Sequence, residues 1–498
     1  MLVFNYLGQI MKKLSIFLFV VSSVLFSSCK KFLEEVPSSV LVAENFYKTD
    51  ADAEAAITAA YDGLNDQSNI YFRGIYLLSE VPTDNAECGQ GVANAFIFAI
   101  DGYTYGPVND RLYVLYTALY KTIAISNVAI DKIPAIEMDA TKKKRLIAEA
   151  KYIRALLYFN LVRLFGDVPL VLKPVTSLDG VNEPRAATAK VYEQILSDLQ
   201  AGETDLDAVN TTANLGRATQ VSATALLAKV YLTLKDYPNA TLKAKQVLDN
   251  PQFGLLDSYN DIFTPENRFN KEIIFSIQNK GNTGTGNGFS MALFLPRATI
   301  PLAGGGTVAG NSADVPTVEF YNSFKVGDLR KDRTFFTQYN AGGGLVTFRP
   351  HWYKYFDPSA ITNLGEATLN FPIIRYSDML LTYAEAINES SGPTAEAYEA
   401  INKVRRRAYG LPIATPSATV DLAGLSKTAF QDAMLNERRW EFGFENQRWF
   451  DLVRTGKLQT VMRASENTLI QDYHVLFPIP QRERDVNKSL TQNEGYPQ

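Results

Sequence analysis

The sequence predicts a mostly α-helical protein built on paired helices, with long irregular insertions and only minor β structure. Two observations lead to this fold class. Apolar residues recur at spacings of three and four over most of the chain, which is the period of an amphipathic helix. Two stretches, at about 66–110 and 254–346, do not follow this period and are rich in glycine and aromatic residues.

The first helices are predicted from their caps and breaks. Residues 51–64 carry a stripe of alanines and follow Thr49-Asp50, whose side chains can accept hydrogen bonds from the first turn of a helix. A second long helix is predicted over 111–130. A third, over 142–165, ends at Gly166-Asp167-Val168-Pro169, because glycine and proline together cannot continue a helix.

Small residues recur where two antiparallel helices of a pair would touch. Residues 223–250 and 375–407 each carry alanines on both sides of a short break, a pattern that resembles the tetratricopeptide repeat. Residues 142–206 form a third candidate pair, whose turn is expanded into a long loop through Pro184. Unrelated helical hairpins with ordinary alanine contacts would give a similar pattern.

The second insertion contains one clear strand signal. Ile273, Phe275 and Ile277 alternate with other residues, which predicts a strand over 272–278. The glycine-rich run 281–288 follows it, as a nucleotide-binding loop would, but it lacks the G-x-G-x-x-G spacing and no helix is predicted after it. Nucleotide binding is therefore disfavoured, while long insertions on a helical scaffold commonly carry function.

The chain begins with an export signal. Lys12 and Lys13 precede an apolar run over 14–26 that is too short to span a bilayer comfortably. The segment Phe26-Ser27-Ser28-Cys29 resembles a bacterial lipobox, whose cysteine is acylated when the signal is removed. Two acyl chains are enough for stable anchoring, so the mature protein is expected to be tethered to a membrane.

Two alternatives concern this N-terminal segment. A plain secretory signal, with Cys29 present by chance, would leave the mature protein without a lipid. Translation can also start at Met11, because residues 1–10 add nothing that a signal requires. In either case we expect residues 1–28 to be removed, and the remaining 470 residues are enough for one large domain or for two or three smaller ones.

The composition of the mature chain excludes some functions. Removal of the two signal lysines leaves 47 Lys and Arg against 53 Asp and Glu, a net charge of −6. A mildly acidic chain argues against nucleic acid as the main partner, since phosphate binding requires clustered basic residues. No apolar run after Phe26 approaches the roughly 20 residues of a membrane-spanning helix.

Cysteine and histidine, which most often bind zinc or act in nucleophilic catalysis, are rare in this chain. Once Cys29 carries lipid, Cys88 is the one remaining thiol, and no neighbouring base would activate it, so a buried, inert thiol is predicted rather than a nucleophile. His351 and His474 stand far apart in the sequence, which disfavours a zinc site and a Ser/His/Asp hydrolase. No calcium-loop pattern occurs, so neither a metal nor a cofactor is predicted.

Several blocks spread over the mature chain form a recognisable series. They are Phe32-Leu33-Glu34-Glu35-Val36-Pro37, Glu149-Ala150-Lys151-Tyr152-Ile153-Arg154, Leu164-Phe165-Gly166-Asp167-Val168-Pro169, Arg375-Tyr376-Ser377-Asp378, Asn436-Glu437-Arg438-Arg439-Trp440-Glu441-Phe442, Arg448-Trp449-Phe450-Asp451 and Gln492-Asn493-Glu494-Gly495-Tyr496. Together with the lipobox, they resemble the SusD/RagB family of Bacteroidetes outer-membrane lipoproteins. The resemblance implies that residues 29–498 form a single tetratricopeptide-containing, SusD-like domain. Such a domain would cover a SusC-like TonB-dependent transporter barrel and capture glycans or other oligomeric nutrients.

The charged blocks allow a structural and a catalytic interpretation. Glu437, Arg438, Arg439 and Glu441 lie about one helical turn apart in pairs, and Arg448 and Asp451 are likewise three residues apart. Charge pairing along a helix explains this spacing, so the structural interpretation is favoured over catalysis.

An oligosaccharide site needs aromatic faces for the apolar side of a sugar ring and planar polar groups for its hydroxyls. Residues of both kinds occur in the predicted loops, and we expect at least two of them to lie in a surface cleft, although packing explains any single one. The candidates are Tyr71, Phe72, Arg73, Glu80, Asp84, Asn85, Tyr103 and Tyr105 in the first insertion, Asn282, Asn287 and Phe289 in the second, and Trp352, Tyr353 and Tyr355 beyond it.

The sequence therefore favours a non-catalytic surface lipoprotein that binds a glycan oligomer and delivers it to a SusC-like TonB-dependent transporter in the outer membrane. One alternative is a peptide-binding, RagB-like member of the same family that uses the grooves of its helical repeats. Another is a surface glycoside hydrolase, which would need two carboxylates about 5–9.5 Å apart across a cleft. Aromatic residues in a cleft would favour glycan, and a polar, asparagine-lined groove without exposed aromatic residues would favour peptide.

Overall fold

A computed structural model describes residues 46–497 except 66–69, 90–91, 93, 177–181, 282–288, 341–343, 360–365, 466 and 468. At residues 72, 289 and 290 it gives only the backbone. The chain divides into two units, Met1–Lys48 and Thr49–Gln498, and the elements below belong to the second. The predicted signal and Cys29 lie outside the described residues. Within the described part of the chain, no helix has both the length and the hydropathy that crossing a membrane requires.

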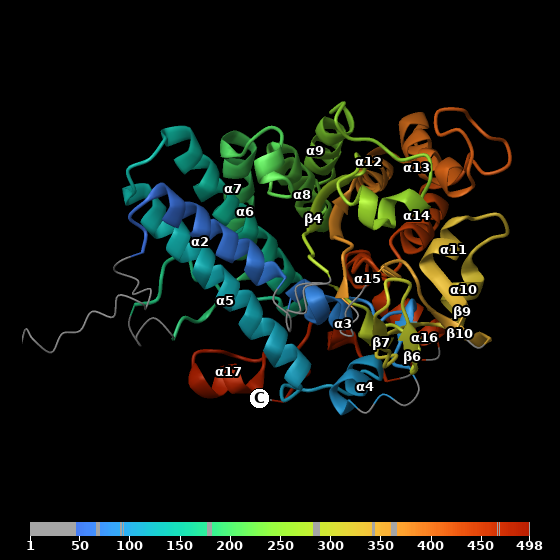
Figure 1. Cartoon of the computed structure of the whole chain (residues 1–498), viewed down its shortest axis with the longest axis horizontal. Helices are drawn as coiled ribbons and strands as arrows, with labels where there is room; N and C mark the ends of the chain where they lie inside the picture. Colours follow the sequence, from blue (N-terminus) through green and yellow to red (C-terminus); the bar gives the residue numbers. More distant parts are fainter. Residues whose placement is uncertain are drawn as a thin grey trace, which may run out of the picture. The chain divides into compact units, whose positions relative to one another are not determined.

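The predicted helical scaffold is confirmed (Figure 1). Its helices pack in series, α2 on α5, α5 on α6, α6 on α7, α7 on α8, α8 on α9, α9 on α12 and α12 on α13, so the three predicted pairs belong to one continuous stack. The helices are α2 (Asp50–Leu64), α5 (Asp110–Lys132), α6 (Ala140–Phe165), α7 (Thr188–Asp205), α8 (Gln220–Thr233), α9 (Tyr237–Leu248), α12 (Tyr376–Ser391) and α13 (Ala395–Ala408).

Local sequence explains where these helices begin and end. The Thr49 hydroxyl accepts a hydrogen bond from the Asp52 N–H at 3.2 Å, and the Asp52 carboxylate accepts one from the Thr49 N–H at 2.8 Å, which is a capping box. Helix α6 ends at Gly166, which adopts φ +71°. Ala240 of α9 and Ala386 of α12 are fully buried in one cluster, so small residues also lie where two successive predicted pairs meet.

The insertions contain more regular structure than the sequence predicted. Their short helices, and those of the C-terminal part, are α3 (Ile75–Ser79), α4 (Ala95–Asp101), α10 (Val318–Ser323), α11 (Arg330–Thr334), α14 (Lys427–Glu441), α15 (Arg448–Arg454), α16 (Leu458–Ala464) and α17 (Gln481–Val486), with a π-helical turn at Ile70–Gly74 before α3. Apart from α14, these helices have five to seven residues, and helical periodicity is hard to detect in fewer than two turns.

The β structure of the described residues consists of antiparallel strand pairs. The predicted strand is β4 (Ile273–Ile277), which pairs with β12 (Phe371–Arg375). The other pairs are β1 (Ala86–Glu87) with β8 (Val315–Pro316), β2 (Val168–Pro169) with β3 (Arg185–Ala186), β5 (Phe289–Ser290) with β11 (Glu366–Ala367), β6 (Thr299–Pro301) with β7 (Thr307–Ala309), and β9 (Phe335–Asn340) with β10 (Leu345–Trp352).

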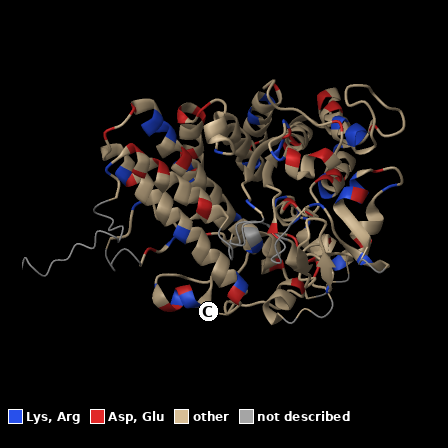
Figure 2. Ribbon diagram, viewed as in Figure 1, with Lys and Arg blue, Asp and Glu red and all other residues tan. Residues whose placement is uncertain are grey.

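Buried ion pairs join the C-terminal helices to the rest of the unit. Glu441 of α14 is fully buried and accepts hydrogen bonds from Arg375 at 2.9 Å and from Arg407 at 2.5 Å. Glu437 accepts from Arg330 at 2.7 Å. In Figure 2, basic and acidic residues are interspersed along the helices.

The prediction that these charges pair along their own helix is wrong. Arg438 pairs with Asp378 of α12 and Asp451 of α15, and Arg448 pairs with Asp84. The physical reason is burial: a charge removed from water needs several close partners, and those come from packed neighbouring elements. The charged blocks therefore hold elements together, as the structural interpretation supposed.

Candidate functional site

Two adjoining cavities open between the helical stack and the β4–β12 pair. Their volumes are about 300 Å³ and 230 Å³. Both are lined by Leu215, Gly216 and Arg217 of the α7–α8 connection and by Phe275 and Ser276 of β4. We call the two together the Arg217 cleft. Each cavity alone approaches the lower end of the range for small-molecule sites, so the cleft offers room for more than one sugar ring.

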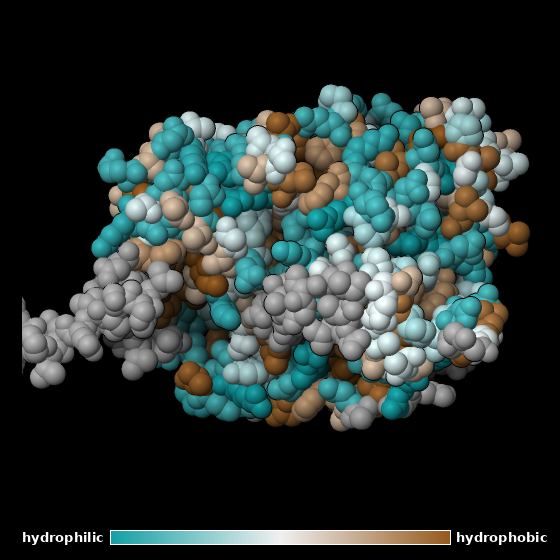
Figure 3. Space-filling view, viewed as in Figure 1, coloured by the Kyte–Doolittle hydropathy of each residue, from teal (hydrophilic) through white to brown (hydrophobic). Residues whose placement is uncertain are grey.

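Apolar side chains line the larger cavity. Phe269 is 41% exposed and Leu215 is 48% exposed, while Phe253 is half-buried beside them. Exposed apolar side chains gathered in a concave site are more informative than the same residues scattered singly. The face shown in Figure 3 is mostly hydrophilic, with its apolar residues in separate patches.

Planar polar groups stand next to these apolar side chains. Asn210 lines the larger cavity, and Asn65 and Gln278 line the smaller one. The Asn65 amide donates to the Gln278 carbonyl at 2.9 Å, which links the end of α2 to the end of β4. Amide and guanidinium planes next to apolar faces provide the two kinds of contact that a sugar ring makes.

Gly216 sets the boundary between the two cavities. It has φ +89°, and a Cβ built on it would lie 2.6 Å from the Gln278 side chain. That side chain is itself fixed, because it accepts a hydrogen bond from Asn370 at 2.7 Å and donates to the Ser276 carbonyl at 2.9 Å. Only glycine permits both this backbone conformation and this close contact.

Arg217 is held from the helical side. Its guanidinium forms ion pairs with Glu54 of α2 at 3.0 Å and with Glu149 of α6 at 3.2 Å. Tyr61 adds a further contact, because its hydroxyl accepts from the Ala218 N–H at 2.9 Å. Burial, reinforced by the Glu149 charge, raises the pKa of Tyr61 well above its ordinary value, so its hydroxyl stays neutral. This wall of the cleft is therefore firmly positioned.

The predicted polar candidates of the first insertion are buried and paired. Asp84 binds both Nε and Nη2 of Arg448 at 2.7 Å, and Asn85 accepts from Arg439 at 2.8 Å. Glu80 is fully buried and accepts from the Asn446 N–H at 2.6 Å. Burial, with the nearby Asp314 charge, raises the pKa of Glu80 well above its usual range. Packing therefore explains these three side chains, since each ties its loop to the C-terminal elements.

Five predicted aromatic candidates are also core residues. The Tyr71 hydroxyl accepts from Asn160 at 2.7 Å, Tyr103 donates to the Pro82 carbonyl, and Tyr105 packs 5.1 Å from Phe477. Trp352 stacks on Phe444 at 4.7 Å and donates to Asp314 at 2.9 Å. Tyr355, from the same segment as Trp352, is fully buried as well. Packing therefore explains these aromatic candidates, whose large apolar surfaces fill the core beneath the insertions.

The remaining candidates are partly exposed or lie outside the description. Arg73 is half-buried, and burial, together with the neighbouring Arg111 charge, lowers its pKa. Tyr353 is half-buried and packs 5.4 Å from Phe336. Asn282 and Asn287 lie outside the described residues, and at Phe72 and Phe289 only the backbone is described, so their side chains stay predictions. None of the candidates lines the Arg217 cleft as described.

Two family models match this chain. Residues 31–232 match the one described as "Starch-binding associating with outer membrane", and residues 333–496 match that of the SusD family. Together they cover most of the chain and include the charged and C-terminal blocks. This chain belongs to the SusD/RagB family.

Relatives of this SusD/RagB protein match over nearly their whole length. SusD-like protein P25 of Formosa agariphila is 27% identical over 94% of this chain and 97% of its own. The starch-binding protein SusD of Bacteroides thetaiotaomicron is 25% identical and covers 87% of each chain. A solved laminarin-binding SusD-like protein superposes with a TM-score of 0.77 at 28% identity, over 90% of this chain and 100% of that one. The predicted SusD-like, mostly α fold is confirmed.

The residues of the Arg217 cleft in this SusD/RagB protein were missed by sequence reasoning. They come from three separate segments, the end of α2, the α7–α8 connection and residues 252–278, so no spacing in the sequence marks them as a set. One signal was available: Phe269 and Gln278 lie inside the second predicted insertion, and Asn65 directly precedes the first. The second insertion therefore contributes to the cleft, although the candidates predicted within it do not.

Proposed function

We propose that this SusD/RagB protein is a non-catalytic lipoprotein of the outer membrane that binds a glycan oligomer in the Arg217 cleft and delivers it to a SusC-like TonB-dependent transporter. The observation that carries the proposal is the composition of the cleft. Exposed Phe269 and half-buried Phe253 line the larger cavity with Asn210, and Gln278 lines the adjoining one. Relatives named for binding starch and laminarin support the choice of glycan.

The cleft favours binding over hydrolysis. Asp62 is the one carboxylate among its described lining residues, whereas glycosidases use two. Affinity for each sugar unit should be modest, because an apolar contact and a few exposed hydrogen bonds must outweigh the cost of ordering a flexible, hydrated ligand. Modest affinity suits a protein that must release its ligand to a transporter.

The proposed role also requires that the protein is anchored to the outer membrane. Acylation of Cys29 would hold the body at the outer membrane beside its partner, and the matching family description also refers to outer-membrane association. Mass spectrometry of the mature N-terminus tests this part. An acylated Cys29 is expected, and an unmodified protein free in the periplasm would contradict the delivery role.

Calorimetric titration of the mature protein with a panel of glycan oligomers tests the binding role. Phe269→Ala should weaken the best ligand by about tenfold or more, because a partly exposed phenylalanine contributes on the order of 1.5 kcal/mol of apolar contact. Phe98→Ala is a matched control, since Phe98 is 43% exposed on α4, outside the cleft, against 41% for Phe269.

Three results would count against the proposal. If Phe269→Ala and Phe98→Ala weaken glycan binding equally, the Arg217 cleft is not the glycan-binding site. Heat of binding with peptides, and none with any glycan, would replace the ligand class. Release of shorter products from an oligosaccharide would replace binding by hydrolysis.

A further inference from the structure

One arginine of helix α6 carries a charge that no acidic residue compensates. Arg163 is half-buried, and its guanidinium lies between two phenylalanine rings, 3.7 Å from the ring centre of Phe159 and 3.6 Å from that of Phe450. Among the residues that the structure describes, it forms no ion pair. The two rings attract the cation but do not neutralise it.

The guanidinium of Arg163 has one nitrogen to spare. Nε donates to the Phe159 carbonyl at 2.9 Å, and Nη2 donates to Asn160 Oδ1 at 2.7 Å. Nη1 has no partner within the described part of the chain, and it is not sealed from solvent. Burial lowers the pKa of Arg163 to about 10, so the group is still a cation at neutral pH. Because the rings cover both faces, a further group can reach Arg163 only along this edge.

Two small cavities meet at Arg163. Their volumes are about 30 Å³ and 20 Å³, and both are lined by Arg163 and Phe159 of α6, Lys229 of α8, and Gln447 and Phe450 at the start of α15. We call the two cavities together the Arg163 site. The site shares no lining residue with the Arg217 cleft.

Gln447 supplies a second free donor. Its Oε1 accepts a hydrogen bond from Lys229 Nζ at 3.0 Å. An ammonium group only donates, so this contact fixes the orientation of the amide and turns Nε2 away from Lys229. Nε2 has no partner among the described residues and, like Arg163 Nη1, is not sealed from solvent. Two free N–H donors next to an uncompensated cation favour an anionic acceptor.

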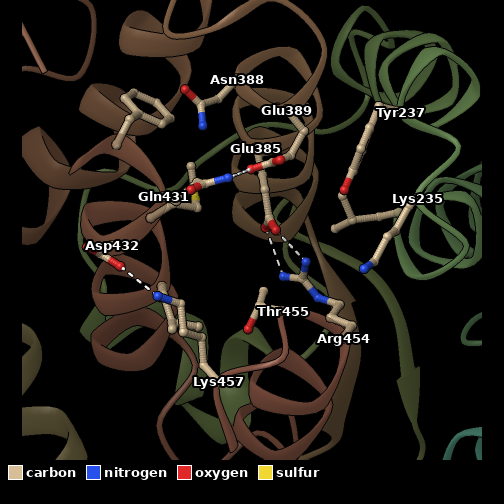
Figure 4. Close-up of a pocket in the computed structure, with 14 residues that line it drawn as sticks. Lys235, Tyr237, Glu385, Asn388, Glu389, Gln431, Asp432, Arg454, Thr455 and Lys457 are labelled. Atoms are coloured by element: carbon tan, nitrogen blue, oxygen red, sulfur yellow. Dashed lines mark hydrogen bonds and ion pairs between the residues drawn. The ribbon is translucent and has the colours of Figure 1, made fainter. Parts of the chain in front are cut away.

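The other charges around the Arg163 site are already paired. A buried network joins Lys229 to Asp378, Arg438 to Asp378 and Asp451, and Arg454 to Asp451 and Glu385. Figure 4 shows the Glu385–Arg454 pair, where both residues also line a separate pocket. Glu445, which lines the larger cavity of the site, is held by Arg375 and Lys354. Each acidic residue described in the lining is thus paired with two cations, and the charge of Arg163 is left over.

The size of the cavities limits the choice of anion. A cavity of about 10–15 Å³ is enough for one water molecule, so each part of the Arg163 site has room for one or two groups of that size. A chloride ion is only slightly larger than a water molecule. Sulfate, phosphate and sugar acids have several heavy atoms and would not fit.

We infer that the Arg163 site binds one chloride ion, which accepts hydrogen bonds from Arg163 Nη1 and Gln447 Nε2. The ion neutralises Arg163 and joins α6 to the start of α15, so it stabilises the contact between the helical stack and the C-terminal elements. This inference does not depend on which ligand the Arg217 cleft takes.

Chloride-35 NMR of the mature protein tests the site, because exchange with a bound state broadens the chloride resonance. Urea unfolding in sodium chloride and in sodium methanesulfonate, at equal ionic strength, gives a second readout. We expect broadening that added bromide reverses, and an unfolding midpoint that rises with chloride and then saturates.

Three variants locate the effect. Arg163→Met should weaken chloride binding by about tenfold or more, since it removes a hydrogen bond from a charged donor. Gln447→Glu replaces the second donor by a carboxylate and should abolish chloride binding as well. Arg482→Met is the control, because the Arg482 side chain is 66% exposed and also lies over a ring, 4.8 Å from the centre of Tyr113.

Chloride effects that are lost in Arg163→Met or Gln447→Glu, and kept in Arg482→Met, support the site. Equal midpoints in the two salts without broadening overturn it, and so do chloride effects that persist in whichever of the first two variants folds or that disappear in the control. If neither variant folds, crystals of the unsubstituted protein grown in sodium bromide decide. Anomalous density beside Arg163 Nη1 supports the inference, and its absence there overturns it.

Discussion

Substitution of Gly216 by alanine tests whether this residue shapes the Arg217 cleft. At φ +89°, an L-residue costs about 1 kcal/mol relative to glycine. The new Cβ would also lie 2.6–2.9 Å from three atoms of the Gln278 side chain. Displacing that side chain would lose its hydrogen bonds to Asn370 and Ser276, each worth about 0.5–1.5 kcal/mol. We expect Gly216→Ala to lower the free energy of unfolding by about 2–3 kcal/mol.

Two other glycines separate the causes. Gly305 has φ +92° with no atom within 4 Å of a built Cβ, so Gly305→Ala measures backbone strain alone. Gly106 has neither a positive φ nor a close neighbour, so Gly106→Ala should be nearly neutral. In a double-mutant cycle, Gln278→Ala should recover about 1 kcal/mol of the Gly216→Ala loss, because the two side chains then no longer meet.

Urea unfolding followed by circular dichroism gives these free energies, and glycan titration of the same variants shows whether the cleft changes. Gly216→Ala should weaken glycan binding together with stability, and Gly305→Ala should affect stability alone. The reasoning fails if Gly216→Ala costs no more than Gly305→Ala, or if Gln278→Ala adds its full effect in the Gly216→Ala background.

Two further predictions concern the buried ion pairs. Burial alone would raise the pKa of Asp451, but the Arg438 and Arg454 charges outweigh it and lower the pKa to about 2. Because the folded pKa of Asp451 is below its unfolded pKa, its carboxylate contributes about 2 kcal/mol of stability above pH 4, and this contribution is lost as the pH falls toward 2. Urea unfolding at pH 5 and pH 2.5 should therefore show a smaller loss of stability in Asp451→Asn than in the unsubstituted protein. Glu441→Gln, which removes the carboxylate shared by Arg375, Arg407 and Arg330, should destabilise by about 3–5 kcal/mol. Glu319→Gln should cost less than about 1 kcal/mol in the same assay, since Glu319 is 65% exposed, and equal costs would contradict the argument.

The helical scaffold could be predicted because its signals are local. Thr49, the alanines of the paired helices and Gly166 each act within one or two turns, and the structure places helix ends within three residues of the predicted ones at α2, α5 and α6. The strand at β4 was predicted for the same reason, since alternation over five residues needs no distant partner.

The candidate site could not be predicted because exposure depends on distant partners. Asp84 is a loop residue by sequence, yet its partner Arg448 lies 364 positions away. Trp352 is of a residue type that can form an exposed platform for a sugar ring, yet it stacks on Phe444. A polar or aromatic residue in an insertion satisfies the same local rules whether it faces a ligand or the core, and only the packing of remote segments decides between them.

The Arg217 cleft and the ion pairs are physically connected. Arg217 lines the cleft, but its guanidinium is held by Glu54 and Glu149 on two helices of the stack. The cleft wall therefore needs no rearrangement to receive a ligand, and little conformational entropy is lost there on binding. Under the proposed function, preorganisation of this kind lets weak individual contacts with a sugar yield measurable affinity. The helices of the stack fix this wall of the cleft, and its contacts to a ligand would be few and exposed. Such a wall suits the proposed capture and release of a ligand.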